Sequence, residues 1–349
     1  MDVLLIAESR PPADVLEGLL RGLDSAGATG VEVLVGGSWV LAAHRVNPIN
    51  QAQVRAALEP GTNGTTGGRI VEPTTSFLTS ADFTSTPTQV AIGQAVFGGR
   101  RIPVVAGPCA VETRDTMASI AAAVAGAGAT GLRGGAFKPQ TLVYNFQGLG
   151  RSGLEVLAEV GREAGLFTVT EVMSPEVAGD IERYVDALQV GSRNMQNFDL
   201  LKRVGRSSRP VILKRGYFAT VEEFLRAGEY VVTHGNPNVI LCERGIRTFE
   251  SQASKFILDL NAIAFLKRRT HLPVVADPSH GSGRRELVTA LARAAVAAGA
   301  DGLMIEVHPE PDASWTGDRA QTIDVQEFGR LVEQVDAVAR AVGREVLVR

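Results

Sequence analysis

The chain has little of what holds small secreted proteins together or marks a membrane protein. Only two of its 349 residues are cysteines, Cys109 and Cys242, so a disulfide framework is excluded and both thiols indicate a reducing compartment. No apolar stretch is long enough to span a bilayer. Residues 1–8 carry charges on both sides of a very short apolar run, unlike a secretory signal. We therefore expect a cytoplasmic protein that has no membrane partner.

The chain also has little excess of charge of either sign. The formal net charge is -3, and the basic residues do not cluster beyond Lys267, Arg268 and Arg269. Such a composition indicates neither a nucleic-acid surface nor a membrane-binding face. Small anionic molecules are the partners that we expect instead.

Apolar residues and glycine are plentiful. With 45% hydrophobic residues and 38 glycines, the chain exceeds one ordinary domain and predicts a large domain with a smaller one. A Gly/Thr-rich stretch at 61–68 separates two differently patterned parts near Pro73. Before it, the pattern predicts strands at 3–7, 31–35, 39–44 and 69–72 and helices at 12–23 and 51–58. This order is typical of a ferredoxin-like α+β domain, which we assign to residues 1–75, with a linker at 76–100.

Residues 101–349 follow another pattern, in which short apolar strands alternate with helical segments. These strands are hydrophobic throughout, as expected where both faces of a sheet are buried. Eight repeats over about 250 residues is the usual size of a closed (β/α)8 TIM barrel, and an open doubly wound sheet is the alternative. The predicted strands are 102–105, 131–134, 167–172, 187–190, 211–214, 239–242, 273–276 and 302–306.

Polar side chains gather where these strands end, which is the side that faces the ligand in either fold. Arginine and lysine converging there suit phosphate and carboxylate groups, so a substrate that bears both groups is implied. The isolated Cys242 is interpreted as a packing residue. The polar residues are Cys109, Glu112, Arg133, Lys138, Glu171, Arg193, Asn194, Lys214, Arg215, Glu243, Arg244, Asp277, His280, Glu306 and His308.

Three of them form a candidate metal site. Cys109, His280 and Glu306 offer a thiolate, an imidazole and a carboxylate, which together suit manganese, iron, cobalt or zinc rather than calcium or magnesium. They follow the first, seventh and eighth predicted barrel strands, which are neighbours once a barrel closes. We expect Asp318 as the fourth ligand, and Asp312 in the same loop is a competing candidate.

Six long motifs at these positions carry a resemblance to a known family. They are similar to those of the 3-deoxy-D-arabino-heptulosonate 7-phosphate (DAHP) synthases, most closely the type I-beta branch, which is related to the 3-deoxy-octulosonate 8-phosphate synthases. The likeness is nearly continuous over residues 100–345, and the N-terminal part resembles the regulatory extension of some members. The motifs lie at 107–112, 133–139, 146–150, 189–197, 242–250 and 276–280.

The resemblance implies a metal-dependent, aldol-like condensation. Phosphoenolpyruvate (PEP) adds through C3 to an aldehyde sugar, erythrose 4-phosphate in the family, water attacks C2, and phosphate leaves. The product, DAHP, opens the shikimate pathway to the aromatic amino acids. A divalent metal ion and a homo-oligomer, dimer or tetramer, are further expectations from the family.

The roles of single residues follow from the same resemblance. Lys138, Cys109 and His280 would be catalytic, with Lys138 as a proton donor whose pKa is lowered by neighbouring cations and burial. The metal ligands would be Cys109, His280, Glu306 and Asp318. PEP would be bound by Arg133, Lys138, Arg193, Lys214 and Arg244, and the aldehyde by Pro139, Gln140, Thr141 and Asp277.

Two departures from the family pattern concern the aldehyde. Gln140 stands where the family has an arginine that binds the phosphate of erythrose 4-phosphate, and residues 251–256 replace a threonine-arginine-asparagine segment. Losing a charge-assisted contact disfavours a phosphorylated tetrose. The enzyme would then be a paralogue of specialised metabolism that accepts a different aldehyde, either unphosphorylated or of another size, unless Arg151, Lys255 or a partner subunit restores the charge. A third hypothesis is a barrel that binds PEP without turnover and acts as a regulatory scaffold.

Overall fold

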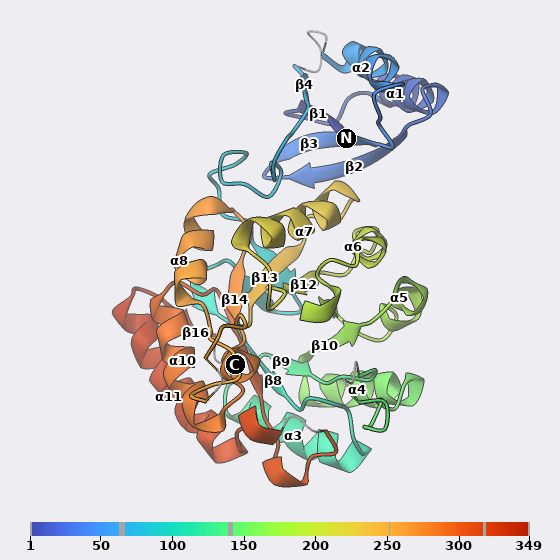
Figure 1. Ribbon diagram of the computed structural model, residues 1–349. Coiled ribbons are helices and arrows are strands. Elements are labelled where there is room, and N and C mark those ends of the chain that lie inside the picture. Colours follow the sequence, from blue (N-terminus) through green and yellow to red (C-terminus); the bar gives the residue numbers. More distant parts are fainter. Residues whose placement is uncertain (1, 63–66, 139–141, 251, 317–318, 348–349) are drawn as a thin grey trace.

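Eight parallel strands close into a barrel in the computed structural model, which describes residues 2–62, 67–138, 142–250, 252–316 and 319–347. The prediction of a (β/α)8 TIM barrel with a small α+β domain is confirmed, and the open sheet is excluded (Figure 1). Around the barrel the strands run β10-β11-β12-β13-β14-β15-β8-β9. Their bounds are β8 Val104–Gly107, β9 Gly131–Arg133, β10 Phe167–Val172, β11 Ala187–Val190, β12 Val211–Lys214, β13 Val239–Glu243, β14 Val274–Ala276 and β15 Leu303–Glu306.

Helices cover the outside of this barrel (Figure 1). Their inward faces are apolar, and most begin at a residue that caps the first turn: the side chain of Thr220, for example, forms a reciprocal capping box with Glu223 at the start of α7. The helices are α3 Arg114–Gly126, α4 Arg151–Ala164, α5 Pro175–Ile181, α6 Phe198–Val204, α7 Val221–Thr233, α8 Leu260–Arg269, α9 Pro278–Ser282, α10 Arg285–Ala297 and α11 Val325–Ala341.

The first barrel strand lies two residues later than predicted. The expected start at Ile102 belongs instead to β7 (Arg101–Ile102), which pairs with β16 (Glu345–Val346) beside the barrel. Pro103 separates the two strands, and β8 then pairs with β15 and β9. The apolar run is continuous through both strands, so periodicity alone could not divide it.

The segment expected to be a linker contains the hairpin β5 (Val90–Ile92) and β6 (Ala95–Phe97). Val90, Ile92 and Phe97 are buried in one cluster with inward-facing barrel residues, including Phe167 at the start of β10. The hairpin therefore closes the amino end of the barrel. Cys242 is fully buried in the same cluster, where burial raises the pKa of its thiol, in keeping with packing.

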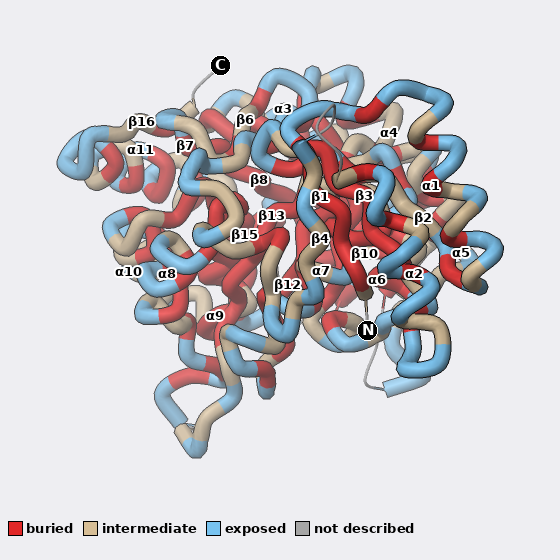
Figure 2. Tube along the Cα trace, turned by 90° about the horizontal axis from the view of Figure 1, so that it is seen from above, coloured by how far each residue is buried: buried red, intermediate tan, exposed pale blue. Residues whose placement is uncertain are grey.

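The N-terminal domain has the strand order β2-β3-β1-β4, with β1 antiparallel to both neighbours, as a ferredoxin-like sheet requires. Alternate residues of β1 face opposite ways: Leu5 packs with the helices, whereas Leu4 and Ile6 belong to the barrel's core cluster. Both faces are thus covered, and β1 is buried along its length (Figure 2). The elements are β1 Val3–Ala7, α1 Ala13–Ser25, β2 Thr29–Val35, β3 Ser38–His44, α2 Gln51–Leu58 and β4 Arg69–Val71.

Helix α7 is the part of the barrel nearest this domain (Figure 1). His44 Nε2 lies 2.8 Å from the carbonyl oxygen of Thr233, and the His44 ring stacks on His234 at 4.2 Å. Earlier in α7, the carboxylate of Glu229 accepts hydrogen bonds from the backbone N–H groups of Leu78 and Thr79 at 2.8 and 2.9 Å. The small domain and the segment after it are therefore anchored to one helix. Within the described residues, no helix has the length and apolarity needed to cross a membrane.

Candidate metal and anion site at the carboxyl end of the barrel

The sequence Asp277-Pro278-Ser279-His280 forms a tight turn from strand β14 into helix α9. Asp277 is the N-cap, with Oδ1 accepting the backbone N–H of His280 at 3.0 Å, and Pro278 occupies the first helical position, where its missing N–H is no loss. This turn fixes the His280 imidazole above the end of β14, so the position of the histidine follows from local capping.

Cys109, His280 and Glu306 converge, as the order of the barrel strands requires. One ligand atom from each of the three lies within 4.8 Å of those of the other two. Glu306 ends β15, and Cys109 follows β8, its neighbour in the sheet. Cys109 and Glu306 are buried, and His280 is nearly so. These are the three described residues among the four ligands that the resemblance implies.

The hydrogen bonds of His280 leave its other nitrogen free for a cation. His280 Nδ1 is 2.8 Å from Asp277 Oδ2, whereas Nε2 is 3.1 Å from Glu306 Oε2. Burial lowers the pKa of His280, so the ring is neutral and carries one proton, which Asp277 draws to Nδ1. The Nε2 lone pair then faces a carboxylate oxygen. Two acceptors in contact suit a positive ion between them, and a carboxylate behind the histidine is the usual support of a metal-binding imidazole.

Glu306 is held by only one of its two carboxylate oxygens. Thr322 Oγ1 donates to Glu306 Oε1 at 2.7 Å, and Ser279 Oγ accepts the backbone N–H of Glu306 at 2.9 Å. Glu306 Oε2 is buried and has no hydrogen-bond partner among the described residues; it lies 3.5 Å from Arg133 Nη1. A buried, orphaned carboxylate oxygen beside a thiol and an imidazole fits a metal ligand.

Cationic side chains surround these residues. Arg133 and Arg244 are buried, and each has an Nη1 atom that lacks a hydrogen-bond partner among the described residues. Lys214 Nζ is 2.5 Å from Asp277 Oδ2. Arg193 is exposed on the turn after β11; burial lowers the pKa of Arg244, and the nearby charge of Arg193 adds to this effect. The guanidinium donors that have no protein partner are suited to an anionic ligand.

The expectation that the pKa of Lys138 is lowered is wrong. Burial does lower it, but the negative charges of Cys109 and Glu171 outweigh burial, and the pKa of Lys138 is raised. Its ammonium group donates to both the Sγ and the carbonyl oxygen of Cys109, at 3.0 Å each. An ammonium in this place favours the thiolate form of Cys109, which is the form that binds metals.

Some predicted residues lie elsewhere or outside the described residues. Pro139, Gln140, Thr141 and Asp318 lie outside the described residues. Asp312, the competing fourth ligand, is exposed and pairs with Arg285 at 2.8 Å, away from the cluster.

Other polar residues at the strand ends hold loops in place. Arg215 donates to the carboxylates of Glu243 and Asp259, at 2.8 and 3.1 Å. Glu112 accepts the backbone N–H of Trp315 at 2.9 Å and pairs with His308 at 3.4 Å. The charges of Arg215 and Glu112 are therefore balanced by partners within the protein. The sequence pattern identified the end of the barrel but could not separate these internal pairs from cations left open to a ligand.

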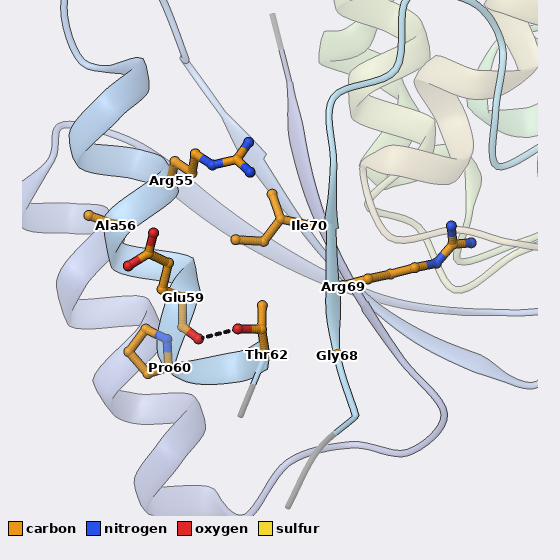
Figure 3. Close-up of a pocket in the computed structure, with 8 residues that line it drawn as sticks. All are labelled: Arg55, Ala56, Glu59, Pro60, Thr62, Gly68, Arg69 and Ile70. Atoms are coloured by element: carbon orange, nitrogen blue, oxygen red, sulfur yellow. Dashed lines mark hydrogen bonds between the residues drawn. The ribbon is translucent and has the colours of Figure 1, made fainter. Parts of the chain in front are cut away.

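A cavity elsewhere among the described residues has a different lining. Figure 3 shows one in the N-terminal domain, between α2 and β4, lined by Arg55, Glu59 and Arg69 among others. Arg55 pairs with Glu72 at 2.9 Å, and Thr62 Oγ1 donates to the carbonyl oxygen of Glu59 at 2.8 Å. Among the described residues, the one group of three or more possible metal ligands is Cys109, His280 and Glu306.

Sequence comparison agrees with this geometry. The sequence model of the DAHP synthetase I family matches residues 80–342. The phospho-2-dehydro-3-deoxyheptonate aldolase of Thermotoga maritima is 43% identical over 269 residues, which span 77% of this chain and 79% of that protein. The 2-dehydro-3-deoxyphosphooctonate aldolase of Nitrobacter hamburgensis is 31% identical over 274 residues, 72% of this chain and 94% of that protein.

Two solved structures are similar to this chain, one of them over nearly its whole length. The crystal structure of the DAHP synthase of Thermotoga maritima superposes with a TM-score of 0.76 at 34% identity and covers 99% of both chains, so the likeness includes the N-terminal domain. A truncated form of the DAHP synthase from the same organism superposes with a TM-score of 0.72 at 41% identity and covers 78% of this chain and 99% of its own.

Proposed function

The chain belongs to the DAHP synthetase I family, and we propose that the site at the carboxyl end of its barrel performs that family's condensation. C3 of PEP forms a bond to the aldehyde carbon of an aldose phosphate, erythrose 4-phosphate in the family. Water adds at C2, phosphate leaves, and the product is DAHP. The observation that carries the proposal is the convergence of Cys109, His280 and Glu306 beside Arg133 and Arg244, two buried cations with open donors.

PEP has two anionic ends, and the site has cations enough for both. Among the described residues, Arg133 Nη1 and Arg244 Nη1 have no hydrogen-bond partner, although Arg133 faces Glu306 at 3.5 Å; Lys138 and Lys214, which pair with Cys109 and Asp277, lie at the same end of the barrel. Holding the phosphate and the carboxylate together restrains PEP and turns one face of its double bond to the aldehyde, an effect worth several kcal/mol or more in well-oriented reactions.

A divalent ion held by Cys109, His280 and Glu306, with Asp318 as a fourth ligand, would supply Lewis-acid polarisation of the aldehyde oxygen. Asp277 holds His280 in the tautomer that leaves Nε2 unprotonated. Thr322 and Ser279 fix the orientation of Glu306. The ligand set suits manganese, iron, cobalt or zinc.

Lys138 is the proton donor in this proposal. Its ammonium stays charged throughout the neutral range because Cys109 and Glu171 raise its pKa, which also makes it a weaker acid than a lysine with a pKa near neutral pH. The same ammonium lies against Cys109, which places it beside the reacting aldehyde in the proposed site.

The aldehyde is assigned from the family, because Gln140 brings no charge to its phosphate. Arg151, one candidate to replace that charge, is exposed and held by Tyr184 at 3.0 Å and Glu155 at 3.5 Å. Lys255, the other candidate, lies 5.8 Å from the centre of the Phe256 ring. We therefore keep erythrose 4-phosphate as the substrate expected from the family and an unphosphorylated aldehyde as the alternative.

The test is phosphate release from PEP in the presence of manganese and a panel of phosphorylated and unphosphorylated aldehydes. Release with erythrose 4-phosphate supports the family reaction. Release only with unphosphorylated aldehydes supports the alternative. Absence of release with every aldehyde would leave the scaffold hypothesis, which the complete trio Cys109, His280 and Glu306 disfavours.

A further inference from the structure

The guanidinium of Arg244 packs against two aromatic rings that are neighbours of each other. Its central carbon is 4.4 Å from the centre of the Phe256 ring and 5.8 Å from that of Tyr217. The two rings are themselves 5.5 Å apart and inclined by 38°. Arg244 is only 8% exposed, and its Nη1 has no hydrogen-bond partner among the described residues.

Backbone hydrogen bonds hold the two rings in place. Ile246 and Ile257 exchange a pair of N–H···O bonds of 3.0 Å each, which aligns the loop after β13 with the segment that carries Phe256. The Arg247 N–H donates to the carbonyl oxygen of Tyr217 at 2.8 Å. On the other side, the Lys255 N–H donates to Ser282 in α9 at 3.0 Å. Phe256 thus links Arg244 to the helix that carries His280.

Glycine at position 245 is required by this packing. Its φ is +88°, and a Cβ there would approach Gly281 of α9 to 2.8 Å and the Phe256 side chain to 3.1 Å. The three segments are therefore in direct contact, and Phe256 has little room to move away from Arg244.

Arg215 shows what an arginine does here when its role is structural. It directly follows the neighbouring strand β12, and its charge is neutralised by the carboxylates of Glu243 and Asp259. Arg244 lies instead against the rings of Phe256 and Tyr217, a cation–π contact that uses no N–H hydrogen bond, and its Nη1 has no hydrogen-bond partner among the described residues. Aromatic stacking therefore orients and buries this cation without neutralising it.

We propose that Phe256, together with Tyr217, is a positioning residue that holds Arg244 ready for an anionic group of PEP. The proposal rests on the proposed function, since it takes PEP as the ligand of Arg244. Phe256 lies in the segment 251–256 that departs from the family pattern, so the ring belongs to this chain's own version of the site.

The test compares Phe256→Leu, which keeps an apolar side chain without a ring, with Phe256→Tyr, which keeps the ring. Because Phe256→Leu removes a desolvated cation–π contact, we expect it to raise the KM for PEP about tenfold, which corresponds to about 1.4 kcal/mol of binding free energy. The kcat and the KM for the aldehyde should stay near the wild-type values, and Phe256→Tyr should restore the KM for PEP. Phe249→Leu, a fully exposed phenylalanine of the same loop, is the matched control and should change nothing.

Direct calorimetric titration with PEP, in the absence of aldehyde, separates the inference from the proposed function. If the wild type releases no phosphate with any aldehyde, the proposed function fails, yet tenfold weaker PEP binding by Phe256→Leu still supports the positioning role. Equal PEP affinity of the wild type and Phe256→Leu overturns the inference, and so does equal weakening by the Leu and Tyr variants. Circular dichroism of each variant confirms that it is folded.

Discussion

Asp277 is the residue whose replacement tests the site most sharply, because one carboxylate oxygen serves two partners. Asp277 Oδ2 lies 2.5 Å from Lys214 Nζ and 2.8 Å from His280 Nδ1, and the residue is fully buried. Although burial raises the pKa of Asp277, the His280 imidazole and the Lys214 ammonium beside it hold this pKa well below its usual value. The Asp277 carboxylate is therefore ionised in the folded protein at neutral pH.

Asp277→Asn keeps the size of the side chain and removes its charge. Lys214 then loses the anion that compensates its buried ammonium, and breaking such a pair costs about 3 to 5 kcal/mol of folding stability. His280 also loses the acceptor that fixes its tautomer, for which a fall in metal affinity of about 10- to 100-fold is typical. The variant should thus lose both stability and metal affinity.

Asp301→Asn is the matched control. Asp301 is likewise buried and lies 2.5 Å from Lys267 Nζ, but at the amino end of the barrel, where its Oδ2 also accepts the N–H of Val274. Both variants should unfold at lower temperature, whereas only Asp277→Asn should bind manganese more weakly in competition with a chelator. If Asp277→Asn binds manganese as the wild type does, or if Asp301→Asn weakens binding equally, the assigned role of Asp277 is refuted.

Three further predictions concern the aldehyde, the small domain and pH. Gln140→Arg should lower the KM for erythrose 4-phosphate in steady-state assays, because it adds a charge-assisted contact; unchanged kinetics would reject the role of Gln140. Deleting residues 1–75 should leave most of the turnover and abolish any effector response, because the domain packs on α7 and the site lies at the strand ends; an unfolded barrel in circular dichroism would argue against this. Burial lowers the pKa of His234 from 6.5 to about 4, so the folded state binds fewer protons than the unfolded state between these pH values and stability falls as pH drops through that range. In thermal unfolding, His234→Gln should reduce the difference in stability between pH 7 and pH 5 by about 1 kcal/mol, a value that allows for solvent screening of this partly buried histidine. An unchanged difference would contradict the assigned role of His234.

The barrel could be predicted because its strands are buried on both faces and therefore read as uninterrupted apolar runs. Strands such as Phe167–Val172 and Ala187–Val190 lie where the sequence predicts them. The same property hid the break at Pro103, because the apolar run continues through β7 into β8. The hairpin at residues 90–97 was missed as well, since nothing local distinguishes three-residue strands within a segment rich in turn formers.

The site was predicted as a set of residue types at strand ends, and this information has a limit. Closure of the barrel brings Cys109 and Glu306 together whatever the surrounding sequence, so their proximity was predictable. Which charges neutralise one another depends on side-chain contacts, and the Arg215–Glu243 pair could not be told in advance from the open cation Arg244. The pKa of Lys138 was mispredicted for the same reason, because the opposing charge of Cys109 lies 29 positions away in the sequence.

X-ray absorption at the metal edge of the manganese-, cobalt- or zinc-loaded protein tests the central claim most directly. The account predicts one sulfur and at least one imidazole nitrogen in the first coordination shell, and loss of the sulfur in Cys109→Ser. A shell of oxygen atoms alone, unchanged by Cys109→Ser, would contradict it.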